Sequence, residues 1–484
     1  MRKALAMIVT AVAALAVTGV AHAESRDAAP GAVSWEQCPD IPGAECGALR
    51  VPLDYRNPDG RTIEIAISRI RSTAPEKRRG VLFTNPGGPG VAGRDFPAAL
   101  VAEGLPRSVR DAYDLIGIDP RGVGRSTPVT CDLTPEQIIR GNIPPYAVTP
   151  DDVTAWARQA HRIAGQCAAS TSAWMLPHVS TANAARDLDR VRVALGERTA
   201  SFLGYSYGTY LGAVYTTLFP HTTDRVVLDS SLHEKGWDVD GGRAYGRGFE
   251  ERFPDFAAWA AARPEYRLGR TPAQVRATYL DLAGRLDRAP VQGVDGASFR
   301  LFSFIYSYDD RRFPLMAASW KALAENQPLP VVDAAPAPAP DPENAIAARL
   351  HTVCADSRWP TAVGVYRANV AADRIRYPLF GAAAANIQPC AFWRDPVEPP
   401  VRIGDRGPAT VLIAQNDRDP GTPLSGARSM RRALGDRAVM VHADQGGHGA
   451  FVFTPNRCLN TAVESFLVTG ERPAHDRWCR AEAR

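Results

Sequence analysis

The sequence predicts an α/β protein with a mostly parallel, twisted sheet, helices on both of its faces, and an inserted, largely helical cap. Short apolar segments, each ending in a glycine- or proline-rich turn, alternate along the chain with amphipathic, helix-like segments. This order is typical of parallel sheets that are covered on both faces. The chain has 484 residues and is 45% hydrophobic, which suits one large domain with an insertion, or two domains.

The predicted strands are segments in which apolar residues alternate with polar ones or form a short unbroken run. A helix is predicted at residues 183–195, where apolar residues recur at helical spacing and charged residues occupy the other side. The predicted strands are residues 62–70, 80–84, 113–118, 226–228 and 409–414.

The cap is predicted at residues 233–400, where the alternation of strands and helices stops and aromatic and arginine residues are frequent. Residues 328–344 within it are rich in proline and alanine. Such a stretch is too broken for a helix or a central strand and is expected to form an exposed loop. The sheet is then built from residues 35–232, before the cap, and from residues 401–484, after it.

A secretory signal peptide is expected at residues 1–23. Arg2 and Lys3 supply positive charge, residues 4–20 are apolar, and residues 21–23 fit the small-x-small cleavage pattern. An uncleaved membrane anchor is the alternative, but the apolar run is alanine-rich and weakly hydrophobic. We therefore expect a secreted protein, extracellular or associated with the cell wall, with no stable membrane association after cleavage.

Eight cysteines follow the signal sequence, and an even number in an exported chain favours disulfides. Pairing of sequential neighbours is the simplest arrangement, and buried free thiols are the alternative. The sequence contains no C-x-x-C motif or Cys/His cluster typical of metal sites and no dinucleotide or phosphate-binding motif, so no cofactor is expected. The formal charge is only +4, and the basic residues are spread along the chain, so nucleic acid is not an expected partner.

Ser206 lies in a G-x-S-x-G pattern with Gly204 and Gly208. The pattern alone is a weak signal, but residues 201–203 suit the end of a strand and residues 209–215 suit the start of a helix. A serine on such a sharp turn exposes its hydroxyl at the edge of the sheet, and the glycines let the backbone segments approach closely. Ser206 is the predicted nucleophile; a structural turn is the alternative.

A serine hydroxyl reacts near neutral pH when a histidine takes its proton and a carboxylate orients that histidine. On sheets of this kind the acid and then the histidine follow the serine along the chain. Asp419 lies in a turn after a strand-like segment, and His448 is flanked by glycines after another. We predict that these two residues complete a triad. Asp417 is a close competitor for the acid, and Asp444 is a weaker one.

The negative charge that develops on the substrate requires backbone N–H groups directed at it. One such group follows the nucleophile, and a second comes from a loop after an early strand. Residues 83–90 (FTNPGGPG) suit that loop, because glycines let the backbone approach a substrate and prolines stiffen it. Tyr207 and Gly88 are the predicted oxyanion-hole donors.

Seven motifs occur together in this chain: VPLDY (51–55), NPGGPG (85–90), DPRGVGRS (119–126), TANAARDLDRVRVALG (181–196), GYSYGTYLG (204–212), DRDPGTP (417–423) and GGHG (446–449). In combination they resemble the secreted bacterial tripeptidyl aminopeptidases, relatives of proline iminopeptidase among the α/β-hydrolases. The resemblance extends from about residue 35 to the C-terminus and is weakest over residues 235–350. It implies an α/β-hydrolase fold and a serine exopeptidase that takes short peptides, with tripeptides expected, from free N-termini.

The resemblance also bears on single residues. In that family the acid of the turn is the aspartate before the proline of a D-P-x-T-P motif, which corresponds to Asp419 and supports it over Asp417. Pro86 stands where many relatives have a histidine in the glycine-rich loop. This departure is compatible with a backbone donor at Gly88 but removes any role for a histidine side chain.

The expected partners are peptides with a free N-terminus, whose α-ammonium group needs a paired carboxylate once it is desolvated. A carboxylic ester hydrolase on the same fold is an alternative, because a nucleophile and an oxyanion hole do not distinguish esters from amides. A non-catalytic exported binding protein is a third possibility. The oligomeric state is not predicted. The acids of the cap region that could bind the ammonium group are Glu234, Asp238, Asp240, Glu250, Glu251, Asp309 and Asp310.

Overall fold

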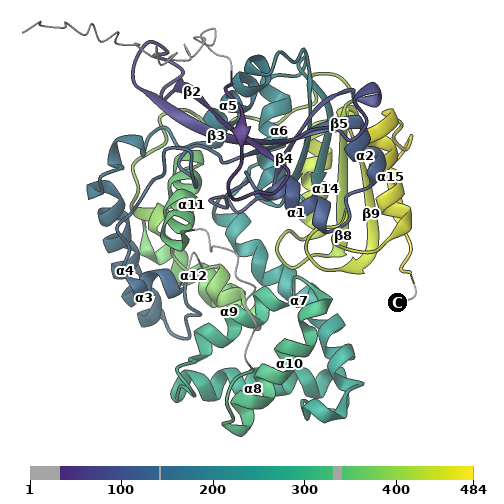
Figure 1. The fold of residues 1–484 in the computed structure, drawn as a ribbon. Helices are drawn as coiled ribbons and strands as arrows, with labels where there is room; N and C mark the ends of the chain where they lie inside the picture. The colour runs from purple at the N-terminus through teal and green to yellow at the C-terminus, as the bar shows by residue number, and fades with distance from the viewer. Residues whose placement is uncertain (1–32, 141–142, 331–340, 483–484) are drawn as a thin grey trace, which may run out of the picture.

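The computed structural model describes residues 33–140, 143–330 and 341–482. The expected signal peptide at residues 1–23 lies outside these residues, as does most of the proline- and alanine-rich segment 328–344. A sheet of ten strands runs through the described part of the chain, with helices on its two faces and a further group of helices beyond one of its edges (Figure 1).

The strand order in the sheet is β1-β2-β3-β5-β4-β6-β7-β8-β9-β10. The pairs from β1 to β5 in this order are antiparallel, and those from β5 onward are parallel. The central strands β4, β5 and β6 are buried along their whole length, as unbroken apolar runs require. The bounds are β1 (Glu36–Gln37), β2 (Glu45–Pro52), β3 (Thr62–Ile70), β4 (Gly80–Asn85), β5 (Tyr113–Ile118), β6 (Ala200–Tyr205), β7 (Thr223–Asp229), β8 (Val411–Arg418), β9 (Ala438–Gly446) and β10 (Arg477–Cys479).

The five predicted strands are all present, and the predicted α/β fold class is confirmed. Their bounds differ from the prediction by at most four residues: β7 starts three residues earlier, at Thr223, whereas β8 starts two residues later, at Val411, and ends four residues later, at Arg418. Pro408 and Thr410 form a turn just before β8, in which the Thr410 N–H donates to the Pro408 carbonyl at 3.0 Å. The helix predicted at residues 183–195 is also present, one to two residues earlier along the chain.

Helices pack on both faces of the sheet because successive side chains of a strand point to opposite sides. Leu82 and Phe83 of β4, for example, belong to two different apolar clusters. The cluster that contains Phe83 is covered by α5, α6 and α14, and the one that contains Leu82 by α1, α2 and α15. The bounds are α1 (Phe96–Ala102), α2 (Arg107–Ala112), α5 (Thr181–Ala194), α6 (Tyr207–Leu218), α14 (Leu424–Leu434) and α15 (Arg457–Thr469).

The described residues between β7 and β8 contain helices and no strand. Helices α7 to α10 enclose an aromatic core of their own around Trp320, and α13 packs against α7 beside this core. Helix α12 packs beside α4, where the Trp156 indole donates to the Ile387 carbonyl at 2.8 Å. Among the described helices, none is both long and apolar enough to cross a bilayer. The bounds are α3 (Pro135–Arg140), α4 (Pro150–Ala169), α7 (Val239–Ala261), α8 (Pro272–Arg288), α9 (Gly296–Tyr306), α10 (Phe313–Glu325), α11 (Pro342–Asp356), α12 (Val363–Arg376) and α13 (Gly381–Ala384).

A network of ion pairs joins α7 to the carboxyl ends of β8 and β9. Arg252 on α7 is fully buried and pairs with Asp255 and Asp310. Arg418, the last residue of β8, pairs with Asp255 at 2.9 Å and with Asp444 of β9 at 2.5 Å. Asp255 therefore connects the helices after β7 with the strand ends that carry the predicted acid and histidine.

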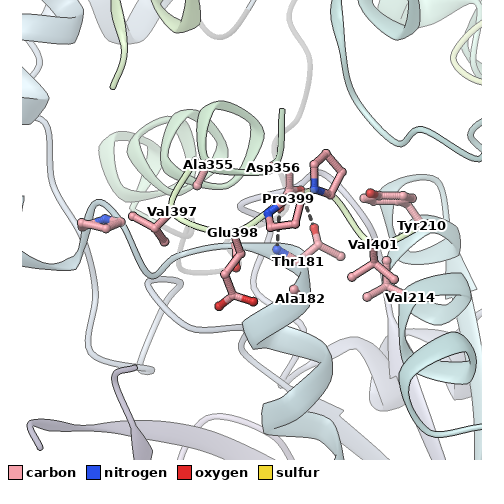
Figure 2. A pocket seen from close by; sticks show the side chains of 13 residues that line it. Thr181, Ala182, Tyr210, Val214, Ala355, Asp356, Val397, Glu398, Pro399 and Val401 are labelled. Carbon is pink, nitrogen blue, oxygen red and sulfur yellow. Dashed lines mark hydrogen bonds between the residues drawn. The ribbon is translucent and has the colours of Figure 1, made fainter. Parts of the chain in front are cut away.

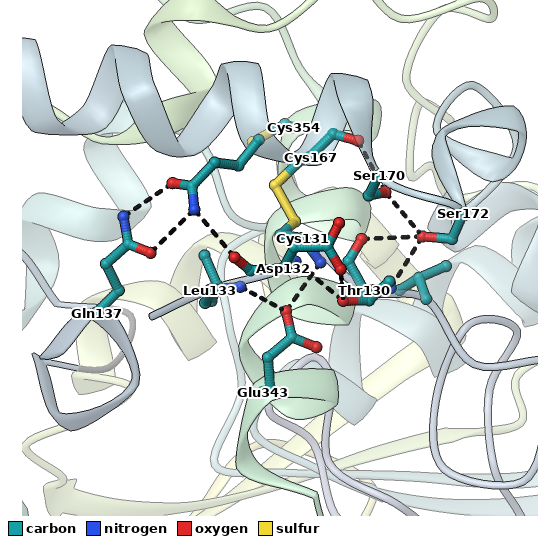
Figure 3. Close-up of a disulfide and its surroundings, with 12 residues drawn as sticks. Thr130, Cys131, Asp132, Leu133, Gln137, Cys167, Ser170, Ser172, Glu343 and Cys354 are labelled. Carbon is teal, nitrogen blue, oxygen red and sulfur yellow. Dashed lines mark hydrogen bonds between the residues drawn. A yellow bond between two sulfur atoms is a disulfide. The ribbon is translucent and has the colours of Figure 1, made fainter. Parts of the chain in front are cut away.

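All eight cysteines form disulfides, and each pairs with its neighbour in sequence, as expected: Cys38–Cys46, Cys131–Cys167, Cys354–Cys390 and Cys458–Cys479. Figure 3 shows the second of these, which ties the segment after β5 to α4, with Glu343 of α11 accepting from the Cys131 N–H at 2.8 Å. Disulfides of this number are typical of proteins that fold in an oxidising compartment.

Removal of Cys131–Cys167 by a double alanine substitution should lower the free energy of unfolding by about 3 to 4 kcal/mol, because the bond closes a loop of 36 residues. The same change at Cys38–Cys46, whose separation is 8 residues, should cost about 2 to 3 kcal/mol. Denaturant unfolding of both variants measures the two values. An equal or larger loss at Cys38–Cys46 would contradict the loop-entropy account.

Candidate active site

Ser206 occupies the sharp turn between β6 and α6. Its backbone has φ 57° and ψ −123°, an uncommon and strained conformation for a residue with a side chain. A Cβ atom added to Gly204 would lie 2.5 Å from the Gly208 carbonyl oxygen, and one added to Gly208 would lie 2.7 Å from Oδ1 of Asn85. Both glycines are therefore required by close backbone packing, and the turn presents Ser206 at the carboxyl end of the parallel strands.

His448 and Asp419 are joined in the structure. Nδ1 of His448 lies 2.9 and 3.0 Å from the two carboxylate oxygens of Asp419. The fully buried Asp419 also accepts hydrogen bonds from the N–H groups of Gly421 and Thr422, at 2.8 and 2.9 Å, and from the Thr422 hydroxyl at 2.9 Å. These contacts fix the carboxylate and hold the imidazole by Nδ1, which leaves Nε2 for a reacting group.

The two competing acids have other partners. Asp417 accepts from the Trp478 indole at 3.1 Å and lies 2.6 Å from Nδ1 of His442. Asp444 pairs with Arg418. Asp417 lies within β8, at an irregularity in its pairing with β9, whereas Asp419 follows the strand. The two acids therefore contact different histidines, and the acid that contacts His448 is Asp419.

Buried Asp229, at the end of β7, links the serine turn to the histidine loop. Its carbonyl accepts from the Ser206 N–H at 3.0 Å, and its carboxylate accepts from the N–H groups of Ala450 and Phe451 at 2.7 and 2.6 Å. Burial raises the pKa of Asp229 to about 7, although the hydrogen bonds from Ala450 and Phe451 act to lower it. Asp229 was not among the predicted site residues; its signal in the sequence is an acid at the end of an apolar strand.

The serine and the histidine thus lie on loops that follow β6 and β9, two strands separated by β7 and β8, and both loops contact Asp229 at the end of β7. The Ser206 hydroxyl makes no hydrogen bond to another residue in the described part of the chain, so the structure brings His448 and Asp419 into contact but not Ser206 and His448. In enzymes without substrate, catalytic hydrogen bonds are often long and tighten when the substrate binds.

The predicted oxyanion donors lie on two facing loops. A Cβ atom added to Gly87 would lie 2.8 Å from Cβ of Ser206 and 3.2 Å from the Tyr207 nitrogen, so the glycine-rich loop passes directly over the serine turn. The Gly87 N–H donates to the Asn85 side chain at 3.0 Å. The N–H groups of Gly88 and Tyr207 donate to no other described residue, and both are available to a ligand.

A short chain of hydrogen bonds holds the Tyr207 side chain. Its hydroxyl lies 2.7 Å from the Thr181 hydroxyl, which donates to Asp356 at 2.6 Å. Figure 2 shows Asp356 beside Thr181, with Glu398 lining the same small pocket. Burial raises the pKa of Asp356 to about 7. This chain anchors the first residue of α6, and hence one of the two candidate donors.

Tyr308, in the helical insertion, contacts His448 directly. Its carbonyl accepts from the His448 N–H at 2.8 Å, and the two ring centroids are 4.8 Å apart. Burial acts to lower the pKa of His448, but the charge and hydrogen bond of Asp419 outweigh it, so the pKa lies above the ordinary value of 6.5. Tyr308 was not among the predicted site residues, because no motif marks its position in the sequence.

One group in the described residues has the chemistry and spacing of a metal site. The candidate ligand atoms of Cys131, Cys167 and His351 lie within 4.8 Å of one another. The two sulfur atoms are joined in a disulfide, and a metal ligand must be a thiolate. This group therefore fits a metal only after reduction of the disulfide.

Comparison with known proteins agrees with this geometry. Residues 377–479, which include Asp419 and His448, match the family of TAP-like proteins. The chain is 35% identical to the tripeptidyl aminopeptidase of Streptomyces coelicolor, with 96% of this chain and 89% of that protein covered. It is 28% identical to the serine protease Hip1 of Mycobacterium tuberculosis, over 92% and 91% of the two chains. It is 29% identical to carboxylesterase B of the same organism, over 91% and 88%.

The match to the Streptomyces coelicolor enzyme shows the family, because it covers 96% of this chain. It therefore runs through the sheet, the helical insertion and the loops that carry the site. The parallel sheet, the strained serine turn and the acid-histidine pair after β8 and β9 are the expected parts of an α/β-hydrolase. The chain belongs to the tripeptidyl aminopeptidase family of α/β-hydrolases, and it is a serine hydrolase of the peptidase type.

Proposed function

We propose that this protein is a secreted serine exopeptidase that releases tripeptides from the free N-termini of peptides. The observation that carries the proposal is the His448–Asp419 pair, at 2.9 Å, on a loop tied through Asp229 to the strained turn of Ser206. The similarity to a tripeptidyl aminopeptidase over nearly the whole chain supports the choice of substrate. The four disulfides support secretion.

In the proposed reaction Ser206 attacks the carbonyl carbon of the scissile bond while Nε2 of His448 takes its proton. Asp419 holds the imidazole by Nδ1 and stabilises the imidazolium that forms. The N–H groups of Gly88 and Tyr207 bind the substrate oxygen as it becomes negative. His448 then protonates the leaving amine, and water, activated by the same histidine, releases the acyl group from the serine.

The substrate ammonium group needs a carboxylate that is not already neutralised by an arginine. Five of the seven candidate acids pair with arginines, and Asp238 lies near His233 at 3.4 Å and caps α7. One carboxylate oxygen of Glu234 is buried without a hydrogen-bond partner. Glu234 also lines a groove of about 1050 Å³. We therefore assign recognition of the ammonium group to Glu234.

The charge state of Glu234 supports this assignment. Burial acts to raise its pKa, but the Ser429 hydroxyl, its own backbone and the neighbouring His233 and Lys235 outweigh burial, so the pKa lies below the ordinary value. Glu234 is consequently ionised at neutral pH, and a carboxylate that is partly removed from water gains most from an ammonium partner.

Ester hydrolysis is the second candidate function, favoured by the similarity to a carboxylesterase. Attack by Ser206 and stabilisation of the oxyanion would follow the same steps on an ester. The two functions differ in the residues that bind the rest of the substrate. A peptide and an ester that share one acyl group therefore distinguish the two functions.

The exopeptidase proposal predicts that a tripeptide anilide with a free amino group is cleaved at least 100-fold more efficiently, in kcat/KM, than its N-acetylated form, since acetylation removes the cation that a buried carboxylate pairs with. Chromogenic assay of the two anilides and of a simple acetate ester measures this ratio. Ser206→Ala should abolish all three activities. A ratio near one, with faster ester hydrolysis, would favour the esterase.

The role of Asp419 can be separated from that of Asp417 by the same conservative change at each. Asp419→Asn should lower kcat by about 10⁴-fold, because the imidazole loses its orienting anion. Asp417→Asn is the matched control: Asp417 contacts His442 rather than His448, so its kcat should change little. The reverse result would assign the acid to Asp417.

The same variants test the pKa of His448. A general base must be neutral, so the wild-type kcat/KM should rise with pH through a midpoint above 6.5, the direction in which Asp419 shifts the histidine. In Asp419→Asn burial still acts to lower the pKa, the charge of Asp419 is lost and only the smaller effect of Asp229 opposes burial, so the midpoint should move to lower pH. The raised pKa also stabilises the folded protein below about pH 6.5, and this stability is lost as pH rises through the folded pKa. A midpoint unchanged in Asp419→Asn would contradict the assignment.

Glu234→Gln should raise KM for the free-amine tripeptide anilide about 10- to 100-fold and leave hydrolysis of the acetate ester unchanged, because only the former carries the ammonium group. Asp240→Asn is the control, since the Asp240 side chain is 74% exposed and pairs with Arg243. Steady-state kinetics on both substrates provide the measurement. Equal effects on the two substrates would show that Glu234 does not bind the amine.

A further inference from the structure

Arg349, on α11, is a buried arginine beside the candidate oxyanion hole. It is 7% exposed, its Nη1 donates to the Gly88 carbonyl at 3.1 Å, and its Cζ lies 4.2 Å from the centroid of the Trp237 ring. The Tyr245 hydroxyl also bonds to the guanidinium. A carbonyl, an indole and a phenol carry no full negative charge, and among the described residues no carboxylate forms an ion pair with Arg349. Buried arginines are normally paired with acids, so a charge kept here without one calls for an explanation.

Between the two prolines of the loop that Arg349 holds, Gly87 and Gly88 are the positions at which the backbone is free to rotate. Gly87 and Gly88 have φ values of +99° and +105°, and neither has a side chain to restrict rotation. A Cβ atom added to Gly90 would lie 2.2 Å from the Ala345 carbonyl oxygen and 2.9 Å from the Arg349 nitrogen. The loop therefore rests directly on α11 at Gly90, while Gly87 packs over the serine turn.

The same helix holds the neighbouring loop. The Asn344 amide donates to the carbonyls of Gly122 and Val129 at 2.9 and 2.8 Å and accepts from the Gly124 N–H at 2.8 Å. The Cys354–Cys390 disulfide fastens the other end of the helix. Because α11 is held at several points, a guanidinium carried by it occupies a defined place relative to the serine turn.

We propose that Arg349 is a positioning residue of the oxyanion hole, a role that rests on the proposed serine-hydrolase function. Its hydrogen bond to the Gly88 carbonyl restricts rotation of the backbone at this glycine and keeps the Gly88 N–H directed at the substrate oxygen. Its positive charge, withdrawn from water, lies behind the loop on which that oxygen becomes negative. Donors that are fixed before the reaction need no reorganisation when the transition state forms. Arg349 therefore acts on the transition state.

The residue type follows from the two contacts. A planar guanidinium can lie on the Trp237 ring and donate in its own plane to Gly88 at the same time. A lysine ammonium would keep the charge but could not satisfy both contacts in one fixed geometry. The proposal therefore distinguishes arginine from lysine, which a requirement for charge alone would not.

The test compares a transition-state mimic with a ground-state ligand. A tripeptide boronic acid forms a negative tetrahedral adduct with a reactive serine, whereas the free tripeptide product binds without one. For Arg349→Met we expect kcat to fall about 100-fold and the boronate Ki to rise by a similar factor, the effect of losing one oxyanion donor. The tripeptide Ki and KM should stay within about threefold. Arg349→Lys should be intermediate in kcat and in the boronate Ki.

Arg437 supplies the matched control. It is 1% exposed, donates to the carbonyls of Gly404 and Thr216 at 3.2 and 2.8 Å, and lies just before β9, at the end of that strand opposite His448. Arg437→Met therefore removes a buried arginine that holds carbonyls elsewhere. It should lower the melting temperature without changing kcat per active site, counted by titration with a serine-directed phosphonate.

Three outcomes would overturn the proposal. Unchanged kcat and boronate Ki in Arg349→Met would make the residue structural only. A tripeptide Ki that rises in step with the boronate Ki would make it a substrate-binding residue. Wild-type values in Arg349→Lys, the variant to use if Arg349→Met does not fold, would show that charge alone suffices. Failure of the phosphonate to label Ser206 in the wild-type protein would instead contradict the proposed function itself.

Discussion

The carboxylate of Asp229 is the contact on which the geometry of the site depends. Its two oxygens accept from Ala450 and Phe451, just after His448, while its own carbonyl accepts from the Ser206 N–H. A buried charge without an opposite charge is costly, and the raised pKa of Asp229 reflects that cost. The cost is tolerated because two N–H groups satisfy the carboxylate, and in return the histidine loop is held against the strand next to the serine.

The helical insertion is part of the site rather than a cover over it. Tyr308 fixes the His448 backbone, Arg349 fixes the glycine-rich loop, and the Arg252–Asp255–Arg418 network joins α7 to the end of β8. A rigid movement of the whole insertion away from the sheet would break these contacts together. The insertion therefore maintains the positions of the histidine loop and of the glycine-rich loop on either side of the serine turn.

The sequence was most informative where the physical cause is local. An apolar run predicts a strand, and helical spacing of apolar residues predicts α5. Glycines on either side of Ser206 indicate the close packing that the turn requires. The strands, the helix and the serine turn can therefore each be predicted from a short stretch of sequence. The choice between Asp417 and Asp419 depends on the direction of two side chains at the end of β8. Spacing cannot supply that direction; the resemblance to a family could.

Asp229, Tyr308 and Arg349 could not be predicted in the same way, because each acts through a contact between segments far apart in the chain. Arg349 and Gly88 are separated by 261 positions, and Tyr308 contributes a backbone carbonyl, which any residue type would provide. Asp229 is different: its type matters, and an acid immediately after a buried strand was a visible signal. Such an acid has either to bind a cation or to organise backbone N–H groups, and here it does the second.

The buried charged groups create an electric field across the site. Two carboxylates, Asp229 and Asp419, lie on the side of His448, whereas the positive Arg349 lies behind the glycine-rich loop. In the proposed acyl transfer a proton moves to the imidazole and negative charge moves to the substrate oxygen, so each charge develops next to fixed groups of opposite sign. Since these groups are held by β7, β8 and α11 before any substrate binds, the field across Ser206 is a property of the fold, and little reorganisation is needed as the bond breaks.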